Sequence, residues 1–228
     1  MDAKLTNFGI EKKAIFIVIL IFIIISLIEV GAHFLFFVNS GIMTKYWIWF
    51  LYLNISISII TGSIWHFFSY KTKINCMTGM MIGMTLGMQV GMMIGAVIGA
   101  TNGFFIGAMV GVIFGVGIGL IIGVKSKTTM GILQGMMSGI MGGTMGPMIS
   151  VMMFFDHLKI FMPIYIVINV AILVVMSYMF YEESIINNKD ECKKVNVDVT
   201  STILISVIIT IILVGIILFL PRSVFLLG

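Results

Sequence analysis

Long apolar stretches separated by short polar segments run through the whole chain. Read between charged and turn residues, they fall near 14–38, 47–70, 79–99, 104–123, 130–154, 161–181 and 201–220. Each stretch is close to the roughly 20 apolar residues that an α-helix needs to cross about 30 Å of hydrocarbon. The pattern therefore predicts an all-α bundle of about seven transmembrane helices, forming one membrane domain over residues 1–228.

The third and fourth of these helices come from one uninterrupted apolar region, residues 79–123. As a single helix it would be roughly 68 Å long, more than twice the thickness of the hydrocarbon layer. The only turn chemistry inside it is Thr101-Asn102-Gly103, where Asn and Gly tolerate a left-handed backbone. We therefore expect a hairpin that folds back at this point, at the centre of the bundle.

The basic residues indicate how the helices are oriented. If the N-terminus is cytoplasmic, the cytoplasmic segments carry ten of the 13 basic residues, namely Lys4, Lys12, Lys13, Lys71, Lys73, Lys125, Lys127, Lys189, Lys193 and Lys194. Only Lys45, Lys159 and Arg222 then lie outside. Because Lys and Arg accumulate in cytoplasmic loops, we expect an inside N-terminus and an outside C-terminus.

Composition narrows the class of protein further. Hydrophobic residues make up 60% of the chain and charged residues 10%, with a mean hydropathy of +1.20. The net charge of +4 comes from lysines at helix ends, so no nucleic acid partner is expected. Motifs for phosphate binding, zinc binding or nucleophilic catalysis are missing, so we expect no enzyme activity. The lipid bilayer is the expected partner, in the cytoplasmic membrane of a bacterium, and the abundance of Ile, Lys and Asn indicates an AT-rich genome.

Glycine recurs at every fourth position through the central hairpin and again in the fifth helix. In lipid, small residues at i and i+4 let helix backbones approach closely, which drives helix association. The stripe advances about 40° per glycine, so it requires more than one neighbouring helix. We expect a glycine zipper, which would also serve homo- or hetero-oligomer contacts. The packing residues are Gly79, Gly83, Gly87, Gly91, Gly95, Gly99, Gly107, Gly111, Gly115, Gly119, Gly123, Gly131, Gly135 and Gly139.

Methionine is the other unusual residue, with 21 in the chain. Two rows lie on helical faces beside the glycines, Met80, Met84, Met88 and Met92 in the third helix and Met141, Met145, Met148 and Met152 in the fifth. Thioethers are soft, neutral ligands that select Cu(I). We expect the two rows to face each other across a narrow gap and to bind or transport Cu(I), the only cofactor or cargo that the sequence suggests.

Two further residues extend this metal path. Cys76 precedes the third helix on the expected cytoplasmic side, where a copper chaperone would exchange the ion, and His157 follows the fifth helix on the outer side. Met-xxx-Met and Gly-xxx-Gly pairs resemble the short motifs of Ctr-type copper transporters. These pairs cover little of the chain, and its seven expected spans differ from the three of that family.

Glu29 and His33 lie one turn apart in the first helix. Ionisable residues within a membrane are functional candidates, so the pair is a candidate proton or ion relay. Three functions therefore remain open: a Cu(I) protein, a glycine-zipper subunit or assembly factor of a larger membrane complex, and a small-solute or proton-coupled transporter using Glu29 and His33. The methionines also suit plain packing, because Met fills irregular gaps. The last two helices carry no candidate site.

Overall fold

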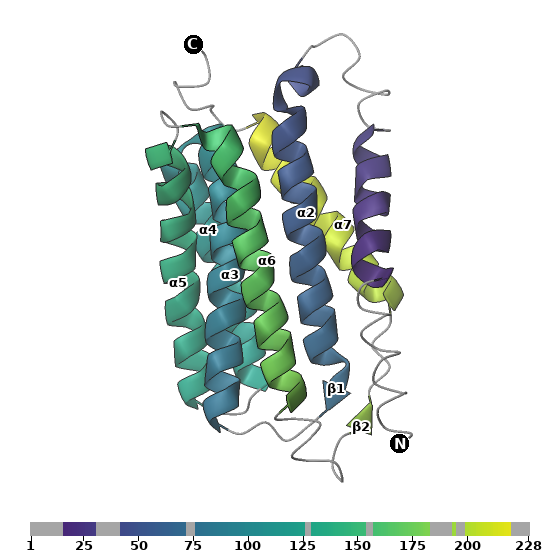
Figure 1. Cartoon of the computed structure of the whole chain (residues 1–228), viewed down its shortest axis with the longest axis vertical. Helices are drawn as coiled ribbons and strands as arrows, with labels where there is room; N and C mark the ends of the chain where they lie inside the picture. The colour runs from purple at the N-terminus through teal and green to yellow at the C-terminus, as the bar shows by residue number, and fades with distance from the viewer. Residues whose placement is uncertain are drawn as a thin grey trace. The chain divides into compact units, whose positions relative to one another are not determined.

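The computed structural model is helical and describes residues 16–30, 42–71, 76–125, 129–153, 157–182, 193–194 and 199–219. Seven helices and two very short strands lie in these ranges (Figure 1). They are an unlabelled first helix Phe16–Val30, α2 Ile42–Phe68, β1 Tyr70–Lys71, α3 Cys76–Asn102, α4 Phe104–Lys125, α5 Thr129–Met152, α6 Leu158–Tyr181, β2 Lys193–Lys194 and α7 Val199–Phe219. The all-α prediction is confirmed for the part of the chain that the structure describes.

Five of the described helices are long and apolar enough to cross a membrane, namely α2, α3, α4, α6 and α7. The first helix has only 15 described residues, because the expected span 14–38 extends into residues 31–38, which are outside the described ranges. Helix α5 has 24 residues but is rich in Gly, Ser and Thr and has few large aliphatic side chains. The chain thus has the character of a multi-pass membrane protein, and α5 is its least lipophilic long helix.

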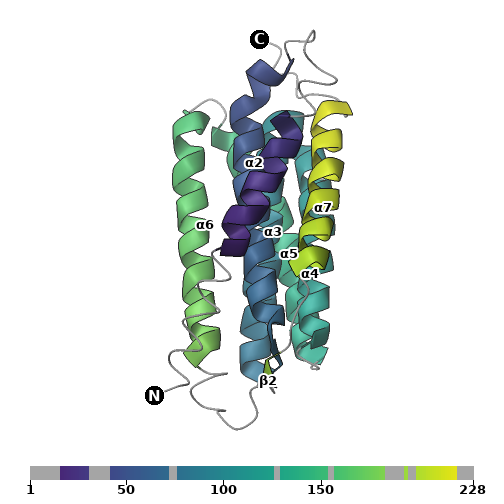
Figure 2. The same ribbon diagram turned by 90° about the vertical axis from the view of Figure 1, so that its right-hand side faces the viewer.

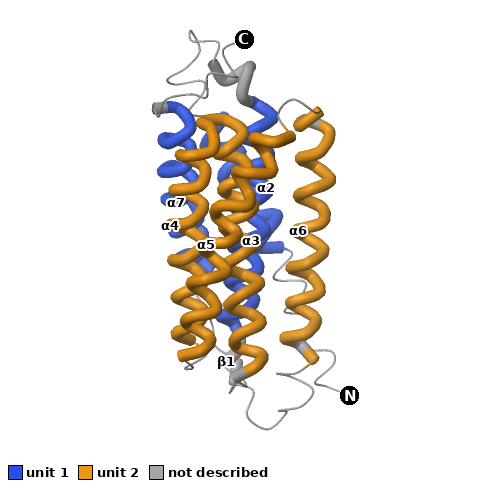
Figure 3. Tube along the Cα trace, turned by 90° about the vertical axis from the view of Figure 1, so that its left-hand side faces the viewer, with its two compact units in different colours: residues 1–69, 196–218 blue, residues 70–195, 219–228 orange. Residues whose placement is uncertain are grey.

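The chain divides into two compact units (Figure 3). One unit contains the first helix, α2 and α7 up to residue 218. The other contains α3, α4, α5, α6 and both strands. Each unit holds one of the two groups of candidate residues, so we describe them separately.

The core of the second unit is a three-helix bundle. Helices α3, α4 and α5 lie side by side, and each contacts the other two, while α6 contacts α3 (Figures 1 and 2). Helix α3 is the most enclosed candidate span, with 72% of its most apolar window buried against 50% or less for the other four. Ile82, Leu86 and Val90 on α3 have almost no accessible surface.

The connection between α3 and α4 lies at the predicted hairpin. Gly103 is the one residue between the two helices, with φ of 94°, a backbone conformation that suits glycine. Its N–H donates to the carbonyl oxygen of Gly99 at 3.1 Å, which closes the last turn of α3. The Thr101 hydroxyl lies 2.8 Å from Asn102 Oδ1 and donates a hydrogen bond to it. Local chemistry therefore sets the position of this turn.

The two strands join segments that are far apart in the sequence. Tyr70 pairs with Lys194 and Lys71 with Lys193 in an antiparallel ladder. The charge pattern assigns both segments to the same side of the membrane. Their pairing agrees with that assignment, although the orientation of the helices remains a prediction.

Candidate functional site

Glycines from three helices meet in the middle of the bundle. A Cβ atom added to Gly111 of α4 would lie 2.9 Å from the carbonyl oxygen of Gly143 in α5 and 3.0 Å from that of Gly91 in α3. A Cβ on Gly91 would in turn lie 2.5 Å from the amide nitrogen of Gly143. All of these neighbours are backbone atoms, so an added Cβ could not be accommodated by a side-chain movement. The three backbones are in direct contact at this level.

The same arrangement recurs toward the end of α4. A Cβ on Gly115 would lie 2.8 Å from the carbonyl oxygen of Gly139 and 3.1 Å from that of Gly87. A Cβ on Gly119 would meet the backbone of Gly135. From Gly107 to Gly123, every fourth residue of α4 is therefore a glycine that faces a glycine of a neighbouring helix.

At the other end of the bundle, the hairpin packs against a proline. A Cβ on Gly95 would lie 2.9 Å from Pro147 Cδ, and one on Gly99 would lie 2.8 Å from Pro147 Cα. A Cβ on Gly107 would lie 2.6 Å from Gly99 Cα. Pro147 is buried within α5, which runs without interruption from residue 129 to 152. Pro147 thus packs against Gly95 and Gly99 of α3.

The remaining glycines separate into contacting and open positions. Gly83 and Gly123 both face Gly131, with added Cβ atoms at 3.3 Å and 2.7 Å from its carbonyl oxygen. Gly79 is buried. Gly117, which lies outside the period of four, has nothing within 4 Å of its Cβ position. Along α4, the period of four therefore distinguishes the glycines that contact another helix from the one that does not.

The fifth-helix methionines share one face, and that face is exposed. Met141, Met145, Met148 and Met152 retain 46% to 68% of their accessible surface. At 100° per residue, they and Gln134 lie within about 60° of one another around the α5 axis. They project from the bundle, whereas its interior is filled by glycine backbones.

The third-helix row borders the same line of contact between α3 and α5. The side-chain amide of Gln134 donates to the sulfur of Met84 at 3.3 Å. A Cβ on Gly142 would meet the backbone of Met88, and one on Gly146 would lie 2.5 Å from the carbonyl oxygen of Met92. Gln134 lies on the methionine face of α5. That face therefore adjoins the methionine row of α3 at Met84. We call this line, bordered by Met80, Met84, Met88, Met92, Met141, Met145, Met148 and Met152, the methionine seam.

The seam differs from the gap that the sequence suggested. Backbone contact between α3 and α5 leaves no space for two rows of side chains to face each other. The α5 row lies on an exposed face, whereas in the α3 row Met84 is exposed and Met80, Met88 and Met92 are half-buried. The register pairs Gly142 with Met88 and Gly146 with Met92, so Met141 is level with Met88 and Met145 is level with Met92.

Cys76 and His157 are the two residues expected at the ends of the metal path. Cys76 is the first residue of α3. His157 is exposed and begins α6 with a left-handed backbone, φ 54° and ψ 41°, and its carbonyl accepts from the amide of Ile160. Within the described ranges no group of three or more His, Cys, Asp or Glu side chains is placed to hold a metal.

The candidate relay lies in the other unit. Glu29 Oε2 accepts a hydrogen bond of 2.6 Å from the side-chain amide of Asn54 in α2. Glu29 Oε1 is buried and has no hydrogen-bond partner among the described residues. His33 lies outside the described residues, so the relay stays a prediction.

Two contacts at the candidate sites were not apparent from the sequence. Gln134 donates to Met84 of the α3 row, although it had no distinguishing pattern around it. Thr210 lies in α7, in a run that looks like plain scaffold, and lines a pocket beside Glu29. Ser206 and Thr210 are one turn apart in an otherwise aliphatic stretch, and that spacing indicates an inward-facing side of α7.

The fold and the two sites define the class of this protein as an all-α protein with several helices able to cross a membrane. No protein family model, curated protein or solved structure matches the chain. Its function must therefore be inferred from its own geometry.

Proposed function

We propose that this multi-pass protein binds Cu(I) along the methionine seam and passes it between successive thioether sites. The observation that carries the proposal is the hydrogen bond from Gln134, which lies on the methionine face of α5, to the sulfur of Met84 in the α3 row. Two rows of soft, uncharged ligands along one line are chemically suited to Cu(I) and poorly suited to harder divalent ions.

The register supports specific ligand sets. Met88 is level with Met141, and Met92 is level with Met145. Each ion would be held by one thioether of α3 and by two of α5 that are one turn apart. Neighbouring sets share a methionine, so an ion can exchange between them without any permanently charged ligand in the low-dielectric layer.

The glycines have a structural role in this proposal. As a glycine zipper, they would bring α3 and α5 into backbone contact and thereby place the two rows within reach of one ion. The close approach at Gly91 and Gly143 supports this role. The zipper would therefore set the geometry of the ligands without contacting the metal.

The membrane setting belongs to the same proposal. With the N-terminus inside, Cys76 at the start of α3 would lie on the cytoplasmic side, where a copper chaperone would exchange the ion. His157 would lie at the outer end. The pairing of β1 with β2 supports a common side for the two lysine-bearing segments.

The test is metal binding by the full-length protein in lipid nanodiscs. The protein would be loaded with Cu(I) under reducing conditions and challenged with a Cu(I) chelator, and the copper–sulfur distances would be measured by X-ray absorption. We expect thioether-coordinated copper in the wild type and at least a tenfold loss of affinity in Met88→Leu/Met141→Leu. The matched control is Met109→Leu, because Met109 is also exposed, at 52%, but lies on α4. No bound copper, or equal affinity in both variants, would refute the proposal.

The alternative role as a subunit of a larger complex has a different signature. The glycines that face other helices are covered by this chain's own helices, so a partner could not dock on them without disrupting the bundle. Gly117 is an open position on α4. If a partner co-purifies and is lost in Gly117→Leu while Met88→Leu/Met141→Leu retains it, the subunit role replaces the copper role.

A further inference from the structure

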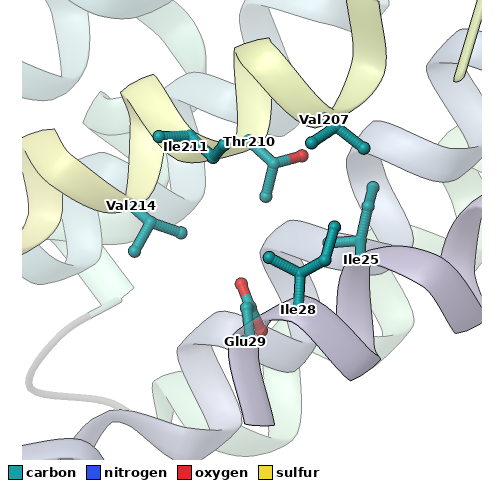
Figure 4. A pocket seen from close by; sticks show the side chains of 7 residues that line it. All are labelled: Ile25, Ile28, Glu29, Val207, Thr210, Ile211 and Val214. Carbon is teal, nitrogen blue, oxygen red and sulfur yellow. The ribbon is translucent and has the colours of Figure 1, made fainter. Parts of the chain in front are cut away.

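A pocket lies between the first helix and α7, within the first of the two units. Its volume is about 140 Å³. Aliphatic side chains form most of its wall, including Ile25 and Ile28 on one helix and Val207 and Val214 on the other (Figure 4). Among the residues that the structure describes, Glu29 and Thr210 are the polar ones that line it. The pocket is thus apolar, with one carboxyl group in its wall.

With Glu29 ionised, the hydrogen bonds among the described residues leave acceptors and no free donor in the pocket wall. Thr210 uses its hydroxyl proton to donate to the carbonyl oxygen of Ser206 at 2.8 Å. Glu29 has one oxygen bonded to Asn54, and its other oxygen is buried without a partner among the described residues. The Glu29 carboxyl group is directed toward the space between Val214 and Thr210 (Figure 4). A buried acceptor without a donor is unfavourable, and a ligand that supplied one would relieve it.

Size and chemistry together select a class of ligand. An apolar cavity of about 150 Å³ in another protein accommodates benzene, so this pocket has room for a compact ring or a short alkyl chain. An ammonium group is a donor and a cation, so it would complement the Glu29 carboxylate. A lipid acyl chain would fill the volume but would leave the carboxyl group without a donor.

We propose that this pocket binds small lipophilic amines, with the ammonium group on Glu29 and the hydrocarbon body among the aliphatic side chains. The site is independent of the methionine seam, since every residue of the pocket belongs to the other unit. Asn54 has a positioning role, because its hydrogen bond holds one oxygen of Glu29 and leaves the other available.

The test compares three probes of similar shape, benzylamine, benzyl alcohol and toluene, on the full-length protein in nanodiscs. Binding would be followed by ligand-observed NMR and by the shift in melting temperature. We expect benzylamine to bind about ten- to a hundredfold more tightly than toluene, since a hydrogen bond to a charged group has that value. Benzyl alcohol should fall between them. Glu29→Gln should abolish the preference and leave toluene binding unchanged.

A second pair of variants tests the pocket without changing Glu29, in case Glu29→Gln does not fold. Val214→Phe would fill the pocket and should remove binding of all three probes. Ile212→Phe makes the same kind of change at a half-exposed position of α7 outside the pocket and should have no effect. The proposal is overturned if toluene binds as tightly as benzylamine, if Glu29→Gln retains the preference, or if a co-purifying lipid displaces all three probes equally.

Discussion

The contact among three helix backbones at Gly111 makes the sharpest prediction about this protein. Replacing Gly111 with Ala adds a Cβ that would lie 2.9 Å from the Gly143 carbonyl oxygen and 3.0 Å from the Gly91 carbonyl oxygen. Ordinary contacts of a Cβ atom are at 3.4–4 Å. Helix α4 must therefore move about 0.5–1 Å from both neighbours, which forfeits a quarter to a half of each dispersion contact.

The expected free-energy change has two opposing parts. Overpacking of this kind typically costs about 1–3 kcal/mol. The higher helix propensity of Ala returns about 1 kcal/mol. We therefore expect Gly111→Ala to lower the free energy of unfolding by up to about 2 kcal/mol relative to wild type, and by about 1–3 kcal/mol relative to a Gly→Ala change that has no clash.

Gly117→Ala is the matched control, on the same helix and in a position with open space around the Cβ. It gains the helix propensity without the clash, so we expect it to be neutral or up to about 1 kcal/mol more stable than wild type. The assay is reversible unfolding in mixed micelles by a denaturing detergent, followed by far-UV circular dichroism. If the two variants agree within about 0.5 kcal/mol, the bundle is not held by glycine contacts and the reasoning is wrong.

Two further predictions use the same unfolding assay. Gly103→Ala should be destabilised by about 1–2 kcal/mol, because an L-residue is strained at the positive φ of the α3–α4 turn. Gly103→Asn should lose less, because Asn tolerates this backbone conformation better. If both variants were as stable as wild type, this turn would be excluded. Asn54→Leu should cost about 1–3 kcal/mol because it removes the donor to Glu29, and adding Glu29→Leu should recover most of the loss. Purely additive effects of the two substitutions would show that their hydrogen bond does not form.

The features that the sequence predicts well are those set by local chemistry. The length and composition of α2, α4, α6 and α7 follow from the width of the hydrocarbon layer. The turn at Gly103 follows from the backbone freedom of one residue. Because neither property depends on a distant partner, both can be deduced from a short stretch of chain.

The candidate sites depended on the register between helices. A period of four in glycine is satisfied when one helix slides by a turn along another, so it cannot specify which glycines meet. Only the packed structure places Gly111 against both Gly91 and Gly143. The same register brings Gln134, which lies on the methionine face of α5, to Met84 in the methionine row of α3.

By itself, then, the sequence predicted a helical protein with several segments long and apolar enough to cross a membrane, a glycine-rich hairpin and two helical rows of methionine. Those conclusions rest on apolar length, on residue spacing and on one turn, all of which are local. Tertiary structure decided which faces meet, where the thioethers lie and how Glu29, Asn54 and Thr210 come together from three helices. The physical reason is that helix contacts in lipid depend on backbone shape along the whole interface, which no short segment of sequence specifies.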